Sequence, residues 1–406
     1  MTTETIPQGY KQTEIGVIPE DWEDGTLSEL TESDGLIRGP FGGSLKKEFF
    51  VKRGLKVYEQ KNAIYRDIEL GDYYIDQNKF MELKRFEVKS GDFIVSCSGT
   101  IGRIYLIPKN APQGIINQAL LIIRLNSSII DKDYFFQYFD WEKFQDKIID
   151  STQGGAMKNL VGMDVFRKTK VALPKSKQEQ SAIATALSQT DELIQHLNKL
   201  ISKKKDIKKG AMQELLTGKK RLPGFSGEWE EKKLGDFTDI KTGKKNNEDK
   251  IEEASYPFFV RSQNVERINS YSFDGEAILV PGEGGVGSIF HYINGKFDYH
   301  QRVYKISNFG REISGKFIYY YMLYDFHKQA TKNSVKATVD SLRLPTFQEF
   351  ELKIPNDQKE QSAIASILSD MDSEIEQLEQ KRNKYQMIKE GMMQQLLTGR
   401  IRLKWK

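Results

Sequence analysis

Side chains that could read the edges of DNA bases occur in two stretches of this sequence. An arginine can donate two hydrogen bonds to guanine, and asparagine or glutamine can form a two-point contact with adenine. The first stretch supplies Lys61, Asn62 and Arg66, and the second supplies Arg261, Gln263, Asn264 and Arg267. These residue types favour contact with a nucleic acid.

A glycine-rich loop at residues 35–47, GLIRGPFGGSLKK, carries Arg38, Lys46 and Lys47. Backbone amides and cations of such a loop suit a phosphate backbone, although the composition also fits a solvated surface loop. Further candidates for DNA contact lie in segments that align between the two halves of the chain or in polar stretches. They are Arg103, Gln118, Lys158, Lys244, Lys245, Gln301, Arg302, Lys336 and Arg343. Residue type alone does not decide which of them reaches a base.

Enzyme signatures are weak by comparison. Residues 282–287, GEGGVG, have the spacing of a dinucleotide fingerprint, but the following SIFHYI alternates like a strand and does not open a helix, so a turn between strands is favoured. The stretch 242–245, TGKK, lacks the upstream glycine of a phosphate-binding loop. The four histidines show no metal-ligand spacing, and Cys97 has no second cysteine to join. We therefore expect no catalytic, metal or cofactor site in this chain.

Composition is that of an ordinary chain of two to three domains. The 406 residues include 38% hydrophobic and 11% aromatic residues, and the net charge is only +4. A near-neutral body can still carry a local basic surface, so DNA binding is permitted but not required. The single cysteine excludes an internal disulfide framework, and the sequence contains neither an 18-residue apolar run nor a signal-peptide pattern at its start. The expected location is cytoplasmic, without membrane contact.

These candidate residues are framed by a tandem duplication. Residues 173–222 and 354–403 align without gaps, and about half of the pairs are identical. Ser176 with Glu179, and Asp357 with Glu360, have capping-box spacing, so a long helix is predicted to start near 177 and another near 358. Both copies end in LLTG, which offers Gly218 and Gly399 as C-terminal caps. Forty residues correspond to a helix of about 60 Å.

Apolar residues in both helices follow three- and four-residue steps, which predicts a coiled coil. Charge favours the antiparallel direction. Lys203–Lys205 would then lie opposite Asp370 and Asp372, with Asp191 and Glu192 opposite Lys381 and Lys384, whereas parallel pairing sets Lys203 against Lys384. Alternatively, these charges only solvate two separate helices.

The segments before the helices match each other weakly but in order, which predicts two α+β domains. Each opens with a tryptophan, Trp22 or Trp229. Residues 57–62 align with 259–264, residues 91–107 with 275–293, and residues 117–120 with 300–303. β-branched and aromatic stretches separated by turns indicate short strands with a few helices. The predicted domains are 1–174 and 223–355, each followed by a helical segment, 175–222 and 356–406.

Together these features resemble the specificity subunit of a type I restriction-modification system. The resemblance rests on the EQSAIA helix starts (179–184 and 360–365), the LLTG helix ends, the W-x-x-x-x-L openings, the SGTIG turn (98–102) and the LP and IP exits at 173–174 and 354–355. Departures occur in the second domain, where 283–287 (EGGVG) replaces SGTIG and the PFGGSLKKEF loop has no clear twin.

The resemblance implies two pseudo-symmetric target-recognition domains separated by an antiparallel coiled coil that acts as a ruler. Such a chain would read a bipartite, gapped site in double-stranded DNA. Chemistry would reside in two methyltransferase subunits, which use S-adenosylmethionine, and two restriction and translocase subunits, which use ATP and Mg. Gln180, Ile183, Gln361 and Ile364 are the candidate centre of the docking surface for the methyltransferase subunits. The alternative function is a bivalent coiled-coil adaptor that binds two proteins.

Overall fold

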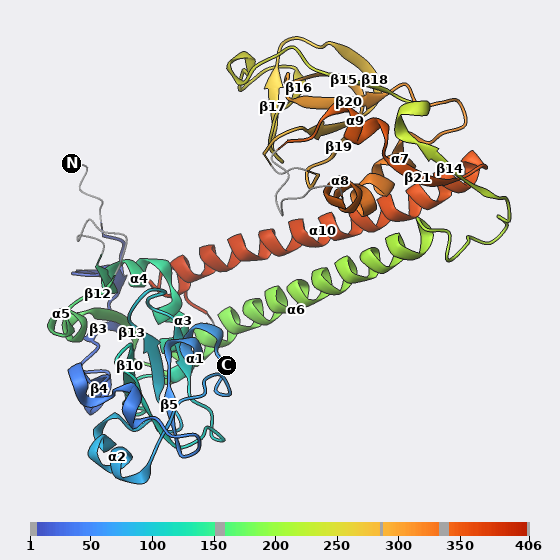
Figure 1. Cartoon of the computed structure of the whole chain (residues 1–406). Coiled ribbons are helices and arrows are strands. Elements are labelled where there is room, and N and C mark those ends of the chain that lie inside the picture. Colours follow the sequence, from blue (N-terminus) through green and yellow to red (C-terminus); the bar gives the residue numbers. More distant parts are fainter. Residues whose placement is uncertain (1–5, 151–158, 285–286, 333–340, 404–406) are drawn as a thin grey trace. The chain divides into compact units, whose positions relative to one another are not determined.

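A computed structural model describes residues 6–150, 159–284, 287–332 and 341–403. The chain forms two compact units, one made of residues 1–196 with 383–406 and the other of residues 197–382. Helices α6 (Lys177–Leu215) and α10 (Gln358–Leu396) each contribute to both units (Figure 1). Each unit also contains one α+β domain, so the predicted fold class is confirmed.

The first unit holds three sheet systems, with strand orders β4-β10-β7-β8, β6-β5-β9 and β13-β3, besides two short pairs. Its elements before α6 are β1 (Tyr10–Thr13), β2 (Gly16–Pro19), β3 (Trp22–Thr26), β4 (Thr31–Arg38), β5 (Leu55–Tyr58), α1 (Gln60–Tyr65), β6 (Tyr74–Ile75), α2 (Gln77–Glu82), β7 (Phe93–Ser96), β8 (Ile104–Leu106), β9 (Gly114–Ile116), β10 (Leu120–Leu125), α3 (Lys132–Asp140), α4 (Glu142–Ile148), β11 (Ile149–Asp150), β12 (Asn159–Leu160), α5 (Met163–Lys168) and β13 (Lys170–Pro174).

The second unit has a six-stranded sheet of order β15-β20-β18-β19-β16-β17 and the pair β14-β21. Its elements are β14 (Trp229–Lys233), β15 (Asp239–Thr242), β16 (Tyr256–Phe259), β17 (Val265–Ile268), β18 (Phe273–Pro281), β19 (His291–Tyr299), β20 (Val303–Ser307), α7 (Gly315–Tyr321), a π-helical segment (Met322–Phe326), α8 (His327–Lys332), α9 (Leu344–Gln348) and β21 (Glu351–Pro355).

The two domains share their strand pairing. In both, the first sheet strand pairs antiparallel with the last (β4 with β10, β15 with β20), and one parallel pair occurs (β5 with β9, β16 with β19). The tryptophan openings pair with the exit strands, Trp22 with Pro174 and Trp229 with Pro355. These matches confirm the predicted internal repeat.

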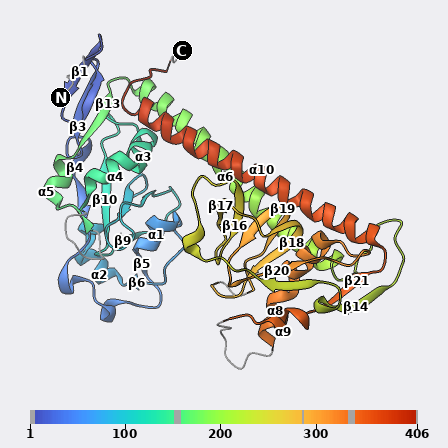
Figure 2. The same cartoon turned by 90° about the horizontal axis from the view of Figure 1, so that it is seen from above.

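Helix α3 covers one face of the first sheet and joins it to α6. Tyr134 and Phe135 of α3 share a buried cluster with Phe93 and Leu121 of the sheet and with Leu187 of α6. In the second unit, α7 plays the same part between the six-stranded sheet and α10. Strands β18 and β19 of this sheet lie along α10 in Figure 2. Each of these aromatic helices attaches its sheet to the long helix that follows.

The helix starts and ends are as predicted, with one correction. Helices α6 and α10 begin at Lys177 and Gln358, and both terminal glycines have φ of +70°, the left-handed conformation that favours glycine. The side chains of Glu179 and Glu360 do not complete a capping box, because each is bound to an arginine instead.

Within each unit the two helices run antiparallel. In the first unit Lys389 Nζ lies 2.7 Å from Asp191 Oδ1, and in the second Lys208 Nζ lies 2.5 Å from Asp372 Oδ1. The antiparallel direction is confirmed, but the register is wrong by more than one helical turn, since Lys203 was expected opposite Asp372 and Lys384 opposite Asp191. The lysines nearest the prediction, Lys204 and Lys205, bind Glu374 and Glu379.

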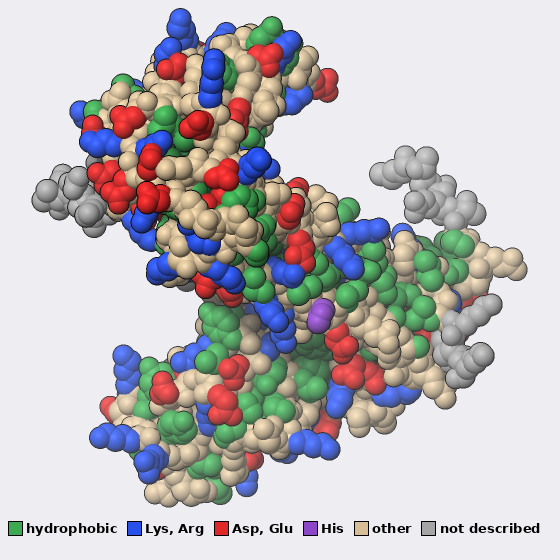
Figure 3. Space-filling model, turned by 90° about the vertical axis from the view of Figure 1, so that its right-hand side faces the viewer, with side chains coloured by type: hydrophobic (Ala, Val, Ile, Leu, Met, Phe, Trp, Pro, Cys, Tyr) green, Lys and Arg blue, Asp and Glu red, His purple; other side chains and the backbone are tan. Residues whose placement is uncertain are grey.

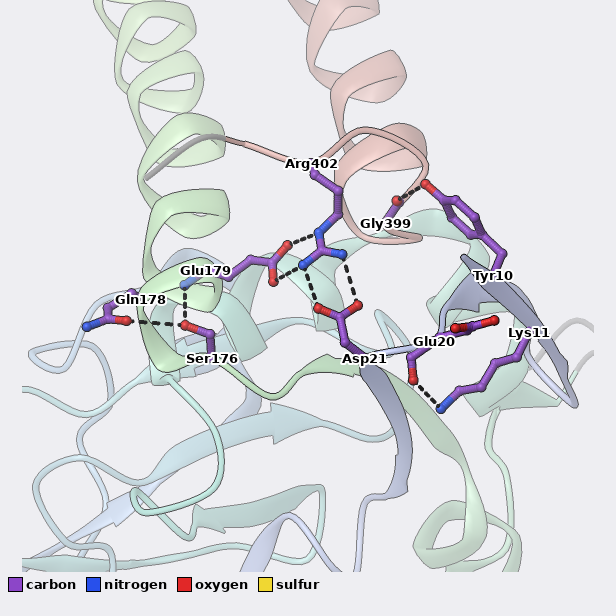
Figure 4. Close-up of polar contacts among 9 residues, drawn as sticks. All are labelled: Tyr10, Lys11, Glu20, Asp21, Ser176, Gln178, Glu179, Gly399 and Arg402. Carbon is purple, nitrogen blue, oxygen red and sulfur yellow. Dashed lines mark hydrogen bonds and ion pairs between the residues drawn. The ribbon is translucent and has the colours of Figure 1, made fainter. Parts of the chain in front are cut away.

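An arginine that follows each LLTG segment forms an ion pair with the buried glutamate at the start of the other long helix. In the first unit Arg402 binds Glu179, whose side chain is only 2% exposed, and both oxygens of Asp21 at 2.9 Å (Figure 4). Arg402 holds the pKa of Asp21 below its ordinary value. In the second unit Arg221 binds Glu360 at 2.6 and 2.7 Å and the carbonyl of Gly227 at 2.8 Å. We call these two arrangements the arginine clasps.

Candidate nucleic-acid interface

The same tight turn precedes β10 and β20. In the first domain the N–H of Leu120 donates to Asn117 O, and the N–H of Ala119 donates to Asn117 Oδ1 at 3.0 Å. In the second domain the N–H of Val303 donates to His300 O, and that of Arg302 donates to His300 Nδ1 at 2.9 Å. A histidine nitrogen thus replaces an asparagine oxygen, and the predicted alignment of 117–120 with 300–303 is confirmed.

Two further loops are bound to this turn in both domains. The N–H of Asn117 donates to Tyr58 O and that of His300 to Phe259 O, each at 2.9 Å. The N–H of Cys97 donates to Ala119 O and that of Gly282 to Arg302 O. Gln60 therefore occupies the position of Arg261, and Ser98 that of Glu283. The predicted alignment of 57–62 with 259–264 was wrong by one residue at this point, whereas the predicted replacement of SGTIG (98–102) by 283–287 placed Glu283 opposite Ser98 correctly.

A fourth loop approaches the turn through a glycine. A Cβ on Gly39 would stand 1.9 Å from Asn117 O, and a Cβ on Gly243 would stand 2.0 Å from Tyr299 O. Both glycines directly follow the strand that pairs with β10 or β20. Gly39, directly before the PFGGSLKKEF loop, therefore corresponds to Gly243 of the TGKK stretch. Only glycine permits this close approach of the backbones.

We name these sets of four loops the first and second loop clusters. The first contains Arg38, Gln60, Ser98 and the turn 117–119. The second contains the stretch 242–245, Arg261, Glu283 and the turn 300–302. Arg38 is half-buried, Gln118 is exposed, and Gln60 Oε1 accepts the N–H of Ser98 at 3.2 Å. Among the predicted residues, Arg38 and Gln118 belong to this cluster, and Lys61 directly follows Gln60 in the chain. Arg103 follows the turn after Ser98, and Lys46 and Lys47 lie at the short 3-10 turn Lys47–Phe49 later in the glycine-rich loop. Sequence reasoning missed the tip of the glycine-rich loop, where the Phe41 side chain is 70% exposed.

The second loop cluster is held together by side chains. Glu283 accepts from Arg302 Nη1 at 2.5 Å and from Arg261 Nη1 at 3.3 Å. Gln301 Nε2 donates to Asn246 Oδ1 at 2.6 Å. Predicted residues that lie in or beside this cluster are Lys244, Lys245, Arg261, Gln301, Arg302 and Arg343, the last because the N–H of its neighbour Leu342 donates to Gly282 O. Glu283 was missed as a participant, although its departure from the SGTIG pattern was a signal.

Three predicted base-reading residues are committed to other contacts. Asn62 is fully buried, and its side chain bonds Glu59 N–H and the carbonyls of Asp67 and Leu70, so this prediction is wrong. Arg66 binds Asp140 and lies over the Phe136 ring. Arg267 donates to the carbonyls of Ala254 and Ser255. Gln263 and Asn264 are exposed in the turn between β16 and β17, and Lys158 and Lys336 lie outside the described residues.

Charge on the visible surface is mixed. In Figure 3, Lys and Arg side chains are interspersed with Asp and Glu side chains and form no continuous basic field.

Burial raises the pKa of the Cys97 thiol to about 12, so this residue beside the first loop cluster stays protonated. Burial and the nearby Arg261 and Arg302 lower the pKa of His300. Among the described residues, no group of three or more His, Cys, Asp or Glu is placed to hold a metal ion.

The predicted docking residues do not form a surface. Gln180, Ile183, Gln361 and Ile364 are all 1% exposed or less. Gln180 accepts the N–H of Asp131 and donates to Pro174 O, while Gln361 accepts the N–H of Ser314 and donates to Pro355 O. This prediction is wrong, because these side chains attach each helix to its own domain.

A different duplicated surface lies between the aromatic helices and the long helices. A groove of about 630 Å³ in the first unit and one of about 520 Å³ in the second are lined by equivalent residues of the repeat. They share the Asp191–Lys389 and Asp372–Lys208 pairs, and their lining includes Ile194, Met393 and Gln394 in the first and Ile375, Met212 and Gln213 in the second. At each rim a lysine covers an aromatic ring, Lys143 over Trp141 and Lys328 over Tyr324.

Comparison with known proteins identifies the family to which this duplicated architecture belongs. A family model described as the type I restriction modification DNA specificity domain matches residues 19–205 and again residues 226–385. The chain belongs to this family. DNA sequence recognition is therefore its function, and an adaptor without DNA readout is not favoured.

Individual relatives agree with this assignment, some of them along nearly the whole chain. The type I restriction enzyme MjaVIII specificity subunit of Methanocaldococcus jannaschii is 25% identical and covers 95% of this chain and 94% of its own length. The EcoDI specificity subunit of Escherichia coli is 28% identical over 44% of this chain and 40% of its own length. A crystal structure of the S subunit from M. genitalium has a TM-score of 0.62 at 17% identity and covers 95% of this chain and 97% of that chain, which supports the fold.

None of the helices in the described part of this specificity protein is long and apolar enough to cross a membrane.

Proposed function

We propose that this chain reads a bipartite DNA site, with each loop cluster reading one half-site and an unread gap between the halves. The observation that carries this proposal is the pair of loop clusters, which share backbone geometry but differ at the side chains they present. One backbone presented twice with different donors and acceptors is suited to two different short sequences. Phosphate contacts would come from cations such as Lys47 and Lys244.

The duplicated grooves support docking of two copies of one partner, because two equivalent surfaces accept identical subunits. We assign them to the two modification subunits. Ile207 and Ile388, equivalent in the repeat and 47% and 40% exposed, provide further apolar surface on the long helices. In this proposal the chain itself is non-catalytic. Two modification subunits with S-adenosylmethionine and two restriction subunits with ATP and Mg supply the chemistry on the DNA that it selects.

Long-read methylation sequencing tests the readout. Cells that express this chain with its modification subunit are compared with cells that lack only this chain. The expected result is a gapped two-part adenine motif that disappears with the chain. A motif that persists without the chain, or a continuous motif without a gap, would contradict the proposal.

Domain exchange tests whether the halves read separately. Replacing residues 20–170 by the equivalent domain of a relative should change one half of the motif and leave the other half and the gap unchanged. The wild-type chain and the reciprocal exchange of residues 227–350 are the matched controls. A change in both halves from either exchange would show that the domains do not read independently.

A further inference from the structure

The second loop cluster contains an ion-paired group that the first lacks. Each oxygen of Glu283 accepts from a different arginine, Oε1 from Arg302 at 2.5 Å and Oε2 from Arg261 at 3.3 Å. At the equivalent positions the first cluster has Ser98, Ala119 and Gln60, none of which is charged. The ionic group is therefore particular to the half-site that the second domain reads.

The carboxylate of Glu283 weakens the attraction of this surface to phosphates, so its presence is not explained by a role in electrostatic attraction. The carboxylate does, however, fix the geometry of the arginine side chains that it binds. A free arginine side chain has many rotamers, and the loss of that freedom opposes binding. The bond to Glu283 removes much of this freedom before DNA arrives, and the turn that carries Arg302 is already closed by the bond from its N–H to His300 Nδ1.

Arg302 keeps donors for a ligand. Its side chain is 58% exposed, and within the described residues its guanidinium bonds only Glu283, through Nη1. A guanidinium has five N–H donors in a planar fork, which suits the two acceptors O6 and N7 on the major-groove edge of guanine. Arg261 is less exposed, at 41%, and anchors the other oxygen of the carboxylate.

We propose that Arg302 reads a guanine in the half-site bound by the second domain and that Glu283 is a positioning residue that holds the Arg302 guanidinium in its reading orientation. This inference rests on the proposed function and specifies the chemistry of one half-site.

The test compares methylation motifs from complexes assembled with the wild-type chain and with R302K, E283Q and the control R311K. R302K keeps the charge but removes the planar fork, so discrimination at one G·C pair should fall about tenfold or more, with the other half-site unchanged. E283Q should relax the same G·C pair to a smaller extent. Arg311 is an exposed arginine of the same unit outside the cluster, and R311K should leave the motif as it is.

Affinity for an unrelated duplex separates positioning from a structural role. E283Q removes one negative charge and should bind unrelated DNA as tightly as wild type or more tightly, while its sequence discrimination falls. A folding defect would lower both affinity and discrimination, and melting temperatures of the variants would show it; R302K then remains as the test of the fork.

Several outcomes overturn the inference while the proposed function stands. They are a second half-site without any G·C pair, an unchanged motif in R302K, and tighter binding by E283Q with an unchanged motif. The last result would mean that Glu283 only neutralises charge. Absence of a two-part motif with the wild-type chain would instead overturn the proposed function.

Discussion

The two loop clusters have the same backbone but differ in how their side chains are held. Asn117 and His300 close the same turn, and Gly39 and Gly243 make the same close approach to it. In the second cluster Arg302 is bound by Glu283 before any ligand arrives, whereas the described part of the chain contains no ion pair for Arg38 of the first. The backbone framework is shared, and the two clusters differ in their side chains, including the residue that closes the turn, Asn117 in the first and His300 in the second.

This difference separates residues that build the frame from residues that read. Equivalent changes at frame residues of the two halves should have similar effects, each on its own half, because the same contacts occur in both. A change at a reading residue should affect one half only. The arginine clasps and the turns belong to the frame, whereas Arg302 belongs to the reading surface and Arg38 to the surface proposed to contact phosphates.

The arginine clasps provide the test with the largest expected effect on the shared frame. R402Q would leave the buried carboxylate of Glu179 without its charged partner, and R221Q would do the same to Glu360, which is 1% exposed. Breaking a buried ion pair by removal of one partner costs about 3–5 kcal/mol. R402Q should therefore lower the unfolding transition of the first unit, and R221Q that of the second, as measured by differential scanning calorimetry.

The neighbouring exposed cations, Arg400 and its repeat equivalent Lys219, provide matched controls. R400Q and K219Q should change stability by less than about 0.5 kcal/mol. A large loss from one clasp variant and none from the other would break the idea of a common frame.

Salt dependence of DNA binding should sharpen the contrast between the reading surfaces. A cation that contacts a phosphate contributes about one unit to the slope of log Kd against log salt concentration. R38Q should reduce the slope by about this amount, because the glycine-rich loop that carries Arg38 suits a phosphate backbone. R261Q should reduce it less, because the charge of Arg261 is already offset by Glu283. Titrations at several salt concentrations with duplexes that contain both half-sites provide the measurement, and R311Q is the control.

Equal slope changes for R38Q and R261Q would contradict the view that the two clusters hold their cations differently. An unchanged slope for R38Q would remove Arg38 from the set of phosphate contacts.

Sequence reasoning succeeded where the pattern was long and periodic. The helix starts at Lys177 and Gln358 and the antiparallel direction followed from capping residues and charge. The register of the two helices could not be predicted in this way, because Asp191 and Asp372 also accept hydrogen bonds from the aromatic helices. The donors are Gln137 Nε2 at 3.0 Å and Tyr320 OH at 2.9 Å. Tertiary contacts of this kind are not visible in helix periodicity.

The candidate site was only partly predictable, because residue type does not reveal burial. Asn62 has the side chain of a base reader but satisfies the backbone at the start of α1 and in the loop after it. Gln180 and Gln361 have the pattern of a repeated docking site but are buried bonds between helix and domain. The grouping of Arg261, Glu283 and Arg302 depends on three loops separated in sequence, and residue type does not reveal that these loops meet at one turn.

The smallest expected effect concerns the turn that closes each cluster, since His300 titrates and Asn117 does not. Burial lowers the pKa of His300 from its ordinary value of 6.5, and its neutral Nδ1 accepts the N–H of Arg302. Because the unfolded chain binds a proton near pH 6.5 and the folded chain does so only at lower pH, the second unit should lose stability as the pH falls below 6.5. The loss is at most about 1.4 kcal/mol per pH unit for one group.

The substitution H300N gives the second turn the acceptor that the first already has, an asparagine oxygen that accepts the same backbone N–H without titrating. Calorimetry between pH 7.5 and 5 should therefore show a weaker pH dependence of the second unit in H300N than in wild type, while the first unit is unaffected. H291Q is needed beside it, because burial also lowers the pKa of His291 in the same unit. If H300N left the pH dependence of the second unit unchanged while H291Q removed it, the two turns would be equivalent in their response to protons, and the difference between the clusters would lie in their reading side chains alone.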